Sequence, residues 1–234
     1  PRPLLPHAGL DHDPSALARH RDALGIAHLV NVVTTGPFLL VGAWGLYVLA
    51  RAGRLGAPRF LNWVGLWTST ALLVVGSGAY HWFLEPWSLA LDRLCIAGII
   101  AFLGAEIAAA TLRWGPSARL SLAFLAVSAG TVVAWMLGAT SWFYGALQGL
   151  GGLGAIALTV WAWRAGRVGK EVLGSVLAFA AFYGLAKVAE VLDVPVCDLT
   201  GWIGGHAIKH LLSAAGLLCL VRWMRASIGT APAR

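Results

Sequence analysis

The segment Leu89–Leu112 reads LALDRLCIAGIIAFLGAEIAAATL and shows the pattern that dominates this chain. Its length matches the roughly 20 mostly apolar residues that an α-helix needs to cross a bilayer. Asp92, Arg93 and Glu106 are the only charged residues within it. We therefore predict a transmembrane helix here, and the same criteria applied to the whole chain predict its fold class.

Seven stretches meet these criteria: Ala27–Ala50, Leu61–Phe83, Leu89–Leu112, Leu120–Leu137, Trp142–Trp163, Val172–Leu192 and Ile203–Trp223. Membrane-spanning β-strands are shorter and alternate in polarity, so these continuous runs favour helices. We predict an all-α fold, a bundle of seven transmembrane helices over residues 27–223. Residues 1–26 are predicted to form a polar N-terminal tail, and residues 224–234 a cytoplasmic tail.

The composition of the chain excludes several classes of protein. Of its 234 residues, 59% are hydrophobic and 12% are charged, against roughly 45–50% and about 25% in soluble domains. The apolar content is too high for a disordered chain. The net charge is +7, but the basic residues lie between apolar runs and not in one cluster, so we expect no nucleic-acid partner. The sequence contains no large loop or soluble domain that would bind another protein, so we expect no protein partner.

Basic residues follow the odd-numbered spans. Eleven of the 17 lie there: Arg51, Arg54, Arg59, Arg113, Arg119, Arg164, Arg167, Lys170, Arg222, Arg225 and Arg234. The opposite loops contain Glu85, Asp193 and Asp198. Because Lys and Arg mark the cytoplasmic side, we predict an outside N-terminus and a cytoplasmic C-terminus. The abundance of Arg, Ala and Gly is typical of GC-rich bacterial genes, so we expect a bacterial cytoplasmic membrane.

Two further patterns predict details of the bundle. Tryptophans near the span ends are expected to form belts at the two membrane interfaces: Trp82, Trp87, Trp142 and Trp202 at the outer ends, and Trp114, Trp161, Trp163 and Trp223 at the inner ends. Gly145 and Gly149 are four residues apart, a spacing that lets a neighbouring helix approach closely.

Ionisable residues inside a bilayer cost at least about 2.5–3.5 kcal/mol each on insertion scales, so each requires a reason. By depth along the spans, His81, Asp92, His206 and His210 all fall in the outer half of the bundle. His206 and His210 are four residues apart and share one helix face, as do Ser77 and His81.

Three histidines that leave one coordination position open are the usual catalytic zinc site. Asp92 would then be available to orient a ligand or to accept a proton from the bound water. A single HxxxH motif is a weak signal, and a histidine near a helix end can instead lie in the headgroup layer. That alternative suits His81 taken alone and fits His210 poorly, because His210 lies two turns into its span.

The other ionisable residues of the spans have structural explanations. Lys187 and Glu190 are three residues apart and are expected to pair with each other, with substrate contact as the alternative. Lys209 is expected to reach the membrane surface or to meet a carboxylate. Glu106 lies near the inner end of its span and is expected to serve as a structural hydrogen-bonding group.

Three blocks resemble the signature motifs of the alkaline ceramidase family: SGAYH at Ser77–His81, Asp92-Arg93, and GHAIKH at Gly205–His210. This family belongs to a superfamily of seven-helix membrane hydrolases that includes the adiponectin and progestin receptors. The resemblance runs from about Leu24 to Trp223. It implies a zinc ion held by His81, His206 and His210, with Ser77 and Asp92 as catalytic residues near the zinc-bound water.

The activity implied by the resemblance is hydrolysis of the N-acyl amide bond of ceramide or a related lipid amide by attack of that water. Animal ceramidases also have an acidic calcium cluster in the N-terminal tail and first helix. Here the matching stretch offers only Asp22 and Asn31, with His28 nearby, so the sequence gives little support for calcium. The alternative function is a seven-helix receptor or sensor with a structural metal. A transporter built on Asp92, Glu106 and Glu190 is a third hypothesis.

Overall fold

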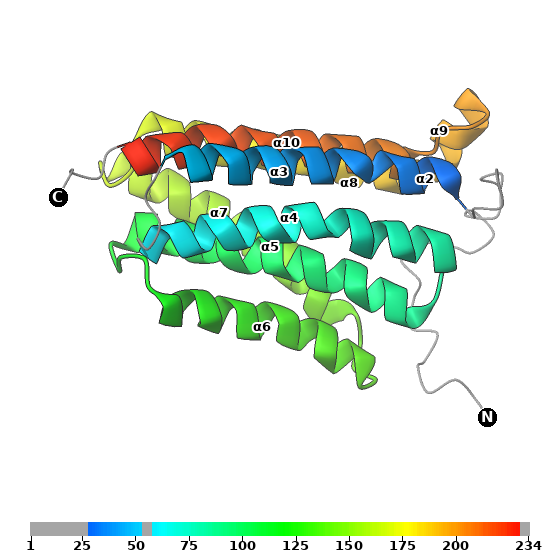
Figure 1. The fold of residues 1–234 in the computed structure, drawn as a ribbon, viewed down its shortest axis with the longest axis horizontal. Helices are drawn as coiled ribbons and strands as arrows, with labels where there is room; N and C mark the ends of the chain where they lie inside the picture. Colours follow the sequence, from blue (N-terminus) through cyan, green and yellow to red (C-terminus); the bar gives the residue numbers. More distant parts are fainter. Residues whose placement is uncertain (1–27, 53–57, 230–234) are drawn as a thin grey trace.

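The computed structural model describes residues 28–52 and 58–229, and these are almost entirely helical. The helices, with the labels of Figure 1, are α2 (Leu29–Thr34), α3 (Gly36–Arg51), α4 (Pro58–Phe83), α5 (Pro86–Leu112), α6 (Ala118–Met136), α7 (Trp142–Arg164), α8 (Lys170–Val191), α9 (Asp193–Thr200) and α10 (Gly205–Gly229). No strand occurs within the described ranges, so the predicted all-α fold is confirmed for them. The predicted tail, residues 1–26, lies outside them.

Seven helical stretches are long and apolar enough to cross a membrane, as predicted. Each overlaps one predicted span, with ends that differ by a few residues. The first stretch, Leu29–Arg51, consists of α2 and α3. The two helices meet at Thr35, just before Pro37 near the start of α3. The last stretch, Gly205–Ile228, extends beyond the predicted end at Trp223.

The segment between the sixth and seventh spans, expected to be a loop, folds as the short helix α9. It ends at Gly201, whose φ of 79° is a conformation that favours glycine. The Asp193 carboxylate at the start of α9 accepts a hydrogen bond of 2.7 Å from the backbone N–H of His206. It thereby satisfies a backbone donor in the first turn of α10 and ties α9 to the start of the last helix.

The helix ends that contain the basic residues gather at one end of the bundle. Figure 1 shows the ends of α3, α5 and α10 and the starts of α4 and α6 together on the left. The end of α4 and the start of α10 lie at the opposite end, on the right. The helix ends with these basic residues therefore lie at the opposite end of the bundle from His81, His206 and His210. Arg54 and Arg234 lie outside the described residues.

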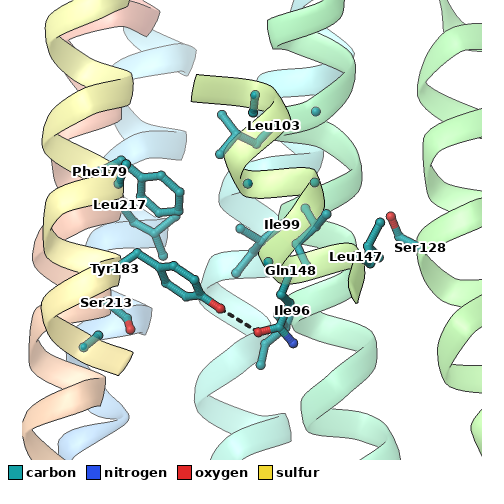
Figure 2. A pocket seen from close by; sticks show the side chains of 18 of the residues that line it. Ile96, Ile99, Leu103, Ser128, Leu147, Gln148, Phe179, Tyr183, Ser213 and Leu217 are labelled. Carbon is teal, nitrogen blue, oxygen red and sulfur yellow. Dashed lines mark hydrogen bonds between the residues drawn. The ribbon is translucent and has the colours of Figure 1, made fainter. Parts of the chain in front are cut away.

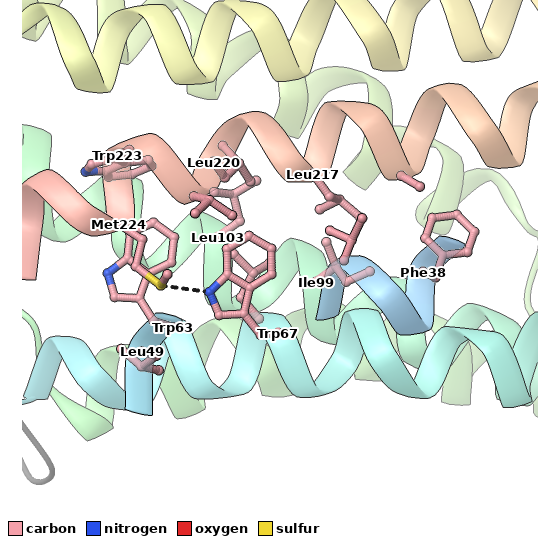
Figure 3. Packing of buried hydrophobic residues seen from close by; sticks show 14 of the residues in the cluster. Phe38, Leu49, Trp63, Trp67, Ile99, Leu103, Leu217, Leu220, Trp223 and Met224 are labelled. Atoms are coloured by element: carbon pink, nitrogen blue, oxygen red, sulfur yellow. Dashed lines mark hydrogen bonds between the residues drawn. The ribbon is translucent and has the colours of Figure 1, made fainter. Parts of the chain in front are cut away.

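Tryptophans form much of the core near the basic end (Figure 3). Trp63 and Trp67 of α4 stack with their ring centroids 6.3 Å apart, and Trp63 meets Trp223 of α10 edge to face at 5.2 Å. The Trp67 indole N–H points at the Met224 sulfur, 2.9 Å away. Trp223 is 1% exposed, so its predicted place in an interfacial belt is wrong. The other seven belt tryptophans are exposed, as expected.

Close helix contacts occur at glycines other than the predicted pair. A Cβ at Gly145 or Gly149 of α7 would have no atom within 4 Å, so the close approach predicted there is wrong among the described residues. Gly45 of α3 instead lies against the Trp67 ring, and Gly205 lies against the Ala189 carbonyl of α8. A side chain at Gly205 would collide with that backbone, so this glycine lets the first turn of α10 approach α8.

Candidate metal centre

Three histidines from two helices meet in the interior of the bundle. His81 lies in the last turn of α4, and His206 and His210 lie in the first two turns of α10. Their exposed fractions are 1%, 1% and 3%. One ring nitrogen from each can be chosen so that all three atoms lie within 4.8 Å of one another. The predicted convergence of these residues is therefore present in the structure.

The rings point toward a common centre. The Nε2 atoms of His81 and His206 are 3.2 Å apart. The ring centroids of His81 and His210 are 5.1 Å apart, and His206 lies 4.8 Å from both. Such crowding of imidazole nitrogens in a dry interior is the arrangement that a shared metal ion stabilises, because each nitrogen then gains a cationic partner. The buried three-histidine group could thus hold a metal ion.

Thr34 lies against the ring of His210. Its Oγ1 is 3.1 Å from the Asn31 carbonyl, the usual helical contact, and 3.1 Å from His210 Nδ1. The single hydroxyl proton can serve only one of these two neighbours. When it is directed at Asn31, Oγ1 accepts the Nδ1–H of His210, and Nε2 is then unprotonated, the form that binds metals.

Sequence reasoning did not identify Thr34. It lies 176 positions before His210 in the chain, within a span whose other residues are mostly apolar. A threonine in a membrane helix normally bonds to its own backbone, as Thr35 does with Val32, so no local signal distinguishes the two.

The two predicted catalytic residues lie together beside the histidines. Ser77 is one turn before His81 on α4, and its side chain lies near the Asp92 carboxylate of α5, with which it lines the same cavity. Asp92 also interacts electrostatically with Lys209 and Arg93. The structure therefore brings together all five predicted site residues.

A long cavity leads away from the histidines. We call it the apolar cavity; its volume is about 760 Å³, and it is bordered at one end by Ser77, Asp92 and His210. It continues along α5 as far as Ile107, which is about 22 Å further at the helical rise per residue. Figure 2 shows Leu103, Phe179 and Leu217 facing into it.

Tyr183 and Gln148 form a polar pair in the lining of the apolar cavity. The Tyr183 hydroxyl of α8 donates a 2.6 Å hydrogen bond to Gln148 Oε1 of α7, which joins the two helices beside the cavity (Figure 2).

A second space of about 380 Å³, which we call the polar cavity, adjoins the apolar cavity near the histidines, and Lys187 and Lys209 line both. His81 and His206 line it, and Asp92 lines both cavities. The three-histidine group therefore lies where an apolar and a polar space meet. A molecule with a long apolar tail and a polar head would place the bond between them next to these histidines.

Charged residues surround the polar cavity. Lys187 donates to one carboxylate oxygen of Glu190 and Lys209 donates to the other, both at 2.7 Å. The predicted Lys187–Glu190 pair is confirmed, and Lys209 meets a carboxylate, one of its two expected outcomes. Glu190 Oε1, the oxygen that bonds to Lys209, also lies 3.9 Å from His206 Nδ1. It places a negative charge near that ring.

Glu106 has the structural role that its position predicts. The Asn62 amide donates to it at 3.0 Å, and Arg59 Nε lies 3.2 Å from its other oxygen. Ser121 of α6 donates in turn to Asn62. This cluster joins α4, α5 and α6 and borders neither cavity.

The segment that matches the calcium cluster of the animal ceramidases lies only partly within the described residues. Asn31 is buried in α2, and Asp22 lies outside the described residues.

Fold and site together define a multi-pass membrane protein with a buried three-histidine group suited to a metal ion. No protein-family model matches the chain, and no characterised protein matches it in sequence.

Proposed function

We propose that this protein is a zinc-dependent hydrolase that cleaves the N-acyl amide bond of a membrane lipid, a ceramide or a related lipid amide. The observation that supports it most directly is the position of the histidines between an apolar cavity and a polar cavity, with Asp92 bordering both. The motif resemblance to alkaline ceramidases points to the same chemistry.

The residues present suit zinc. Three imidazoles are a common donor set for catalytic zinc, and Thr34 Oγ1 is placed to accept the Nδ1–H of His210, which would leave Nε2 for the metal. His81, His206 and His210 would hold the ion. When bound, it would act as a Lewis acid that makes a water molecule nucleophilic near neutral pH.

The remaining chemistry belongs to the chain's own residues. In hydrolysis, a C–O bond forms between water and the acyl carbon, the C–N bond breaks, and the products are a fatty acid and an amine. Asp92 would accept the proton from the attacking water and pass it to the leaving nitrogen. Ser77, whose side chain lies near Asp92, would hold that carboxylate in position by donating a hydrogen bond to it.

The cavities suggest how the substrate binds. The acyl chain would occupy the apolar cavity, which excludes water from the reacting bond, and the head group would occupy the polar cavity. The distribution of basic residues supports a cytoplasmic C-terminus and an outside N-terminus, so the histidines would lie in the outer half of a bacterial cytoplasmic membrane.

The test begins with metal content. The purified protein should contain about one zinc per chain by elemental mass spectrometry, and His210→Ala should lose it. His28→Ala removes a buried histidine outside the three-histidine group and should keep the zinc. Absence of zinc from well-folded protein, even after zinc is supplied, would refute the proposal.

Activity is the second measurement. The wild type should release free fatty acid from ceramide or another N-acyl lipid, and Asp92→Asn should keep zinc but lose most of the turnover. If Asp92→Asn hydrolysed the lipid at the wild-type rate, the proton-transfer role would be wrong. A receptor with a structural metal would bind zinc and release no fatty acid from any lipid amide.

A further inference from the structure

Positive charge predominates around the polar cavity. Three cationic side chains line it, Arg93, Lys187 and Lys209, together with two carboxylates, Asp92 and Glu190. With all five groups ionised, the net charge of these side chains is +1, without counting any metal ion. A metal dication at the histidines would increase it further. This cavity is the space that receives the lipid head group under the proposed function.

The three cations come from three different helices. Arg93 lies on α5, Lys187 on α8 and Lys209 on α10. Arg93 is 2% exposed, and its guanidinium carbon lies 4.4 Å from the centroid of the Trp135 ring and 5.1 Å from that of Tyr144. Two aromatic faces thus hold this cation in a fixed, largely dry position, where its field is weakly screened by water.

The two lysines are arranged to meet a second acceptor. Both bond to Glu190, through different oxygens, at 2.7 Å. An ammonium group has three N–H donors, so a lysine bonded to one carboxylate can still donate to another anion. Lys187 is 49% exposed and Lys209 is 21% exposed, so both can be approached from the cavity.

A neutral head group suits these surroundings less well than an anionic one. Hydroxyl groups can accept hydrogen bonds from the cations but cannot neutralise their charge in a partly dry site. A carboxylate or phosphate can do both. The same cations would offset the repulsion between an anionic substrate and the carboxylates of Asp92 and Glu190.

We propose that the enzyme prefers lipid amides with an anionic head group, above all long-chain N-acyl amino acids, over neutral lipid amides. In an N-acyl amino acid the carboxylate is attached one carbon from the amide nitrogen, so it would enter the polar cavity when the amide lies at the histidines. Hydrolysis would consume one water and release a fatty acid and a free amino acid. This inference rests on the proposed hydrolase function and narrows its substrate.

A matched pair of substrates tests the preference. N-Oleoylglycine and N-oleoylethanolamine share the acyl chain and the amide, and they differ by a carboxylate against a hydroxymethyl group. We expect kcat/KM in detergent micelles to be at least tenfold higher for N-oleoylglycine, a factor that corresponds to about 1.4 kcal/mol. N-Oleoylethanolamine phosphate, as a third substrate, separates a requirement for carboxylate from a requirement for negative charge.

Lys187 is the residue to change, because it is half exposed and Lys209 still bonds to Glu190 without it. Lys187→Gln should reduce the preference for N-oleoylglycine about tenfold, and Lys187→Glu should reverse it. Lys170→Gln is the matched control: Lys170 is an exposed lysine at the other end of α8 and lines neither cavity. It should leave the preference unchanged.

Binding is measured separately from turnover. In zinc-free protein, N-oleoylglycine should raise Tm more than N-oleoylethanolamine does, and Lys187→Glu should remove the difference. Equal kcat/KM for the two substrates, unaffected by both Lys187 variants, would overturn the preference while leaving the hydrolase in place. Charge-dependent binding with no hydrolysis of either lipid would instead overturn the proposed function and support the anion-selective cavity.

Discussion

Thr34→Val removes one hydroxyl and tests how the metal centre is held together. Thr34 Oγ1 lies 3.1 Å from both the Asn31 carbonyl and His210 Nδ1, so it can accept the Nδ1–H of a metal-bound His210 while donating to Asn31. Valine has nearly the same shape but cannot accept, so the His210 ring would lose this supporting bond. Loss of such a supporting bond typically lowers metal affinity 10- to 100-fold, about 1.4–2.8 kcal/mol. We expect a loss in that range.

The assay is zinc affinity, measured by competition with a chromogenic chelator in detergent. Thr34→Ser keeps the hydroxyl and should bind zinc like the wild type. Thr35→Val removes the neighbouring hydroxyl, which donates to the Val32 carbonyl. It controls for a general effect of valine in this segment. Wild-type zinc affinity in well-folded Thr34→Val would refute the supporting role of Thr34.

Three further predictions concern packing, catalysis and the metal. Gly205→Ala should lower the free energy of unfolding by about 1–3 kcal/mol, because the new Cβ would meet the Ala189 carbonyl. Gly149→Ala is the control and should not destabilise the protein, because a Cβ there has open space around it. Thermal unfolding would compare the two variants, and equal Tm values would contradict this packing. Ser77→Ala should lower kcat more than it raises KM, because under the proposed function Ser77 orients Asp92 and is only one of many residues that line the apolar cavity. Steady-state kinetics would decide, and an unchanged kcat would exclude that role. Removal of zinc by a chelator should lower the Tm of the wild type, because a ligand at 100 times its Kd stabilises the native state by about 2.7 kcal/mol. The Tm of His210→Ala, which is expected to hold no zinc, should not change with the chelator.

The seven membrane spans, and the shared helix face of His206 and His210, can be predicted from the sequence. Length and apolarity suffice to identify membrane helices, because the bilayer imposes the same thickness on each. His206 and His210 share a face because four residues make about one helical turn, and Lys187 meets Glu190 for the same local reason. These relations hold within one helix and need no knowledge of its neighbours.

Contacts between helices required the tertiary structure. Thr34 meets His210, Asp193 caps the turn that begins α10, and Trp223 packs inside against Trp63. The close glycine contacts fall at Gly45 and Gly205 and not at the predicted pair. A helix that is apolar on every side gives little indication of which face meets which neighbour. The sequence by itself therefore determined which segments cross the membrane and which polar groups share a helix face, while the packing of the helices decided which of those groups meet to form a site.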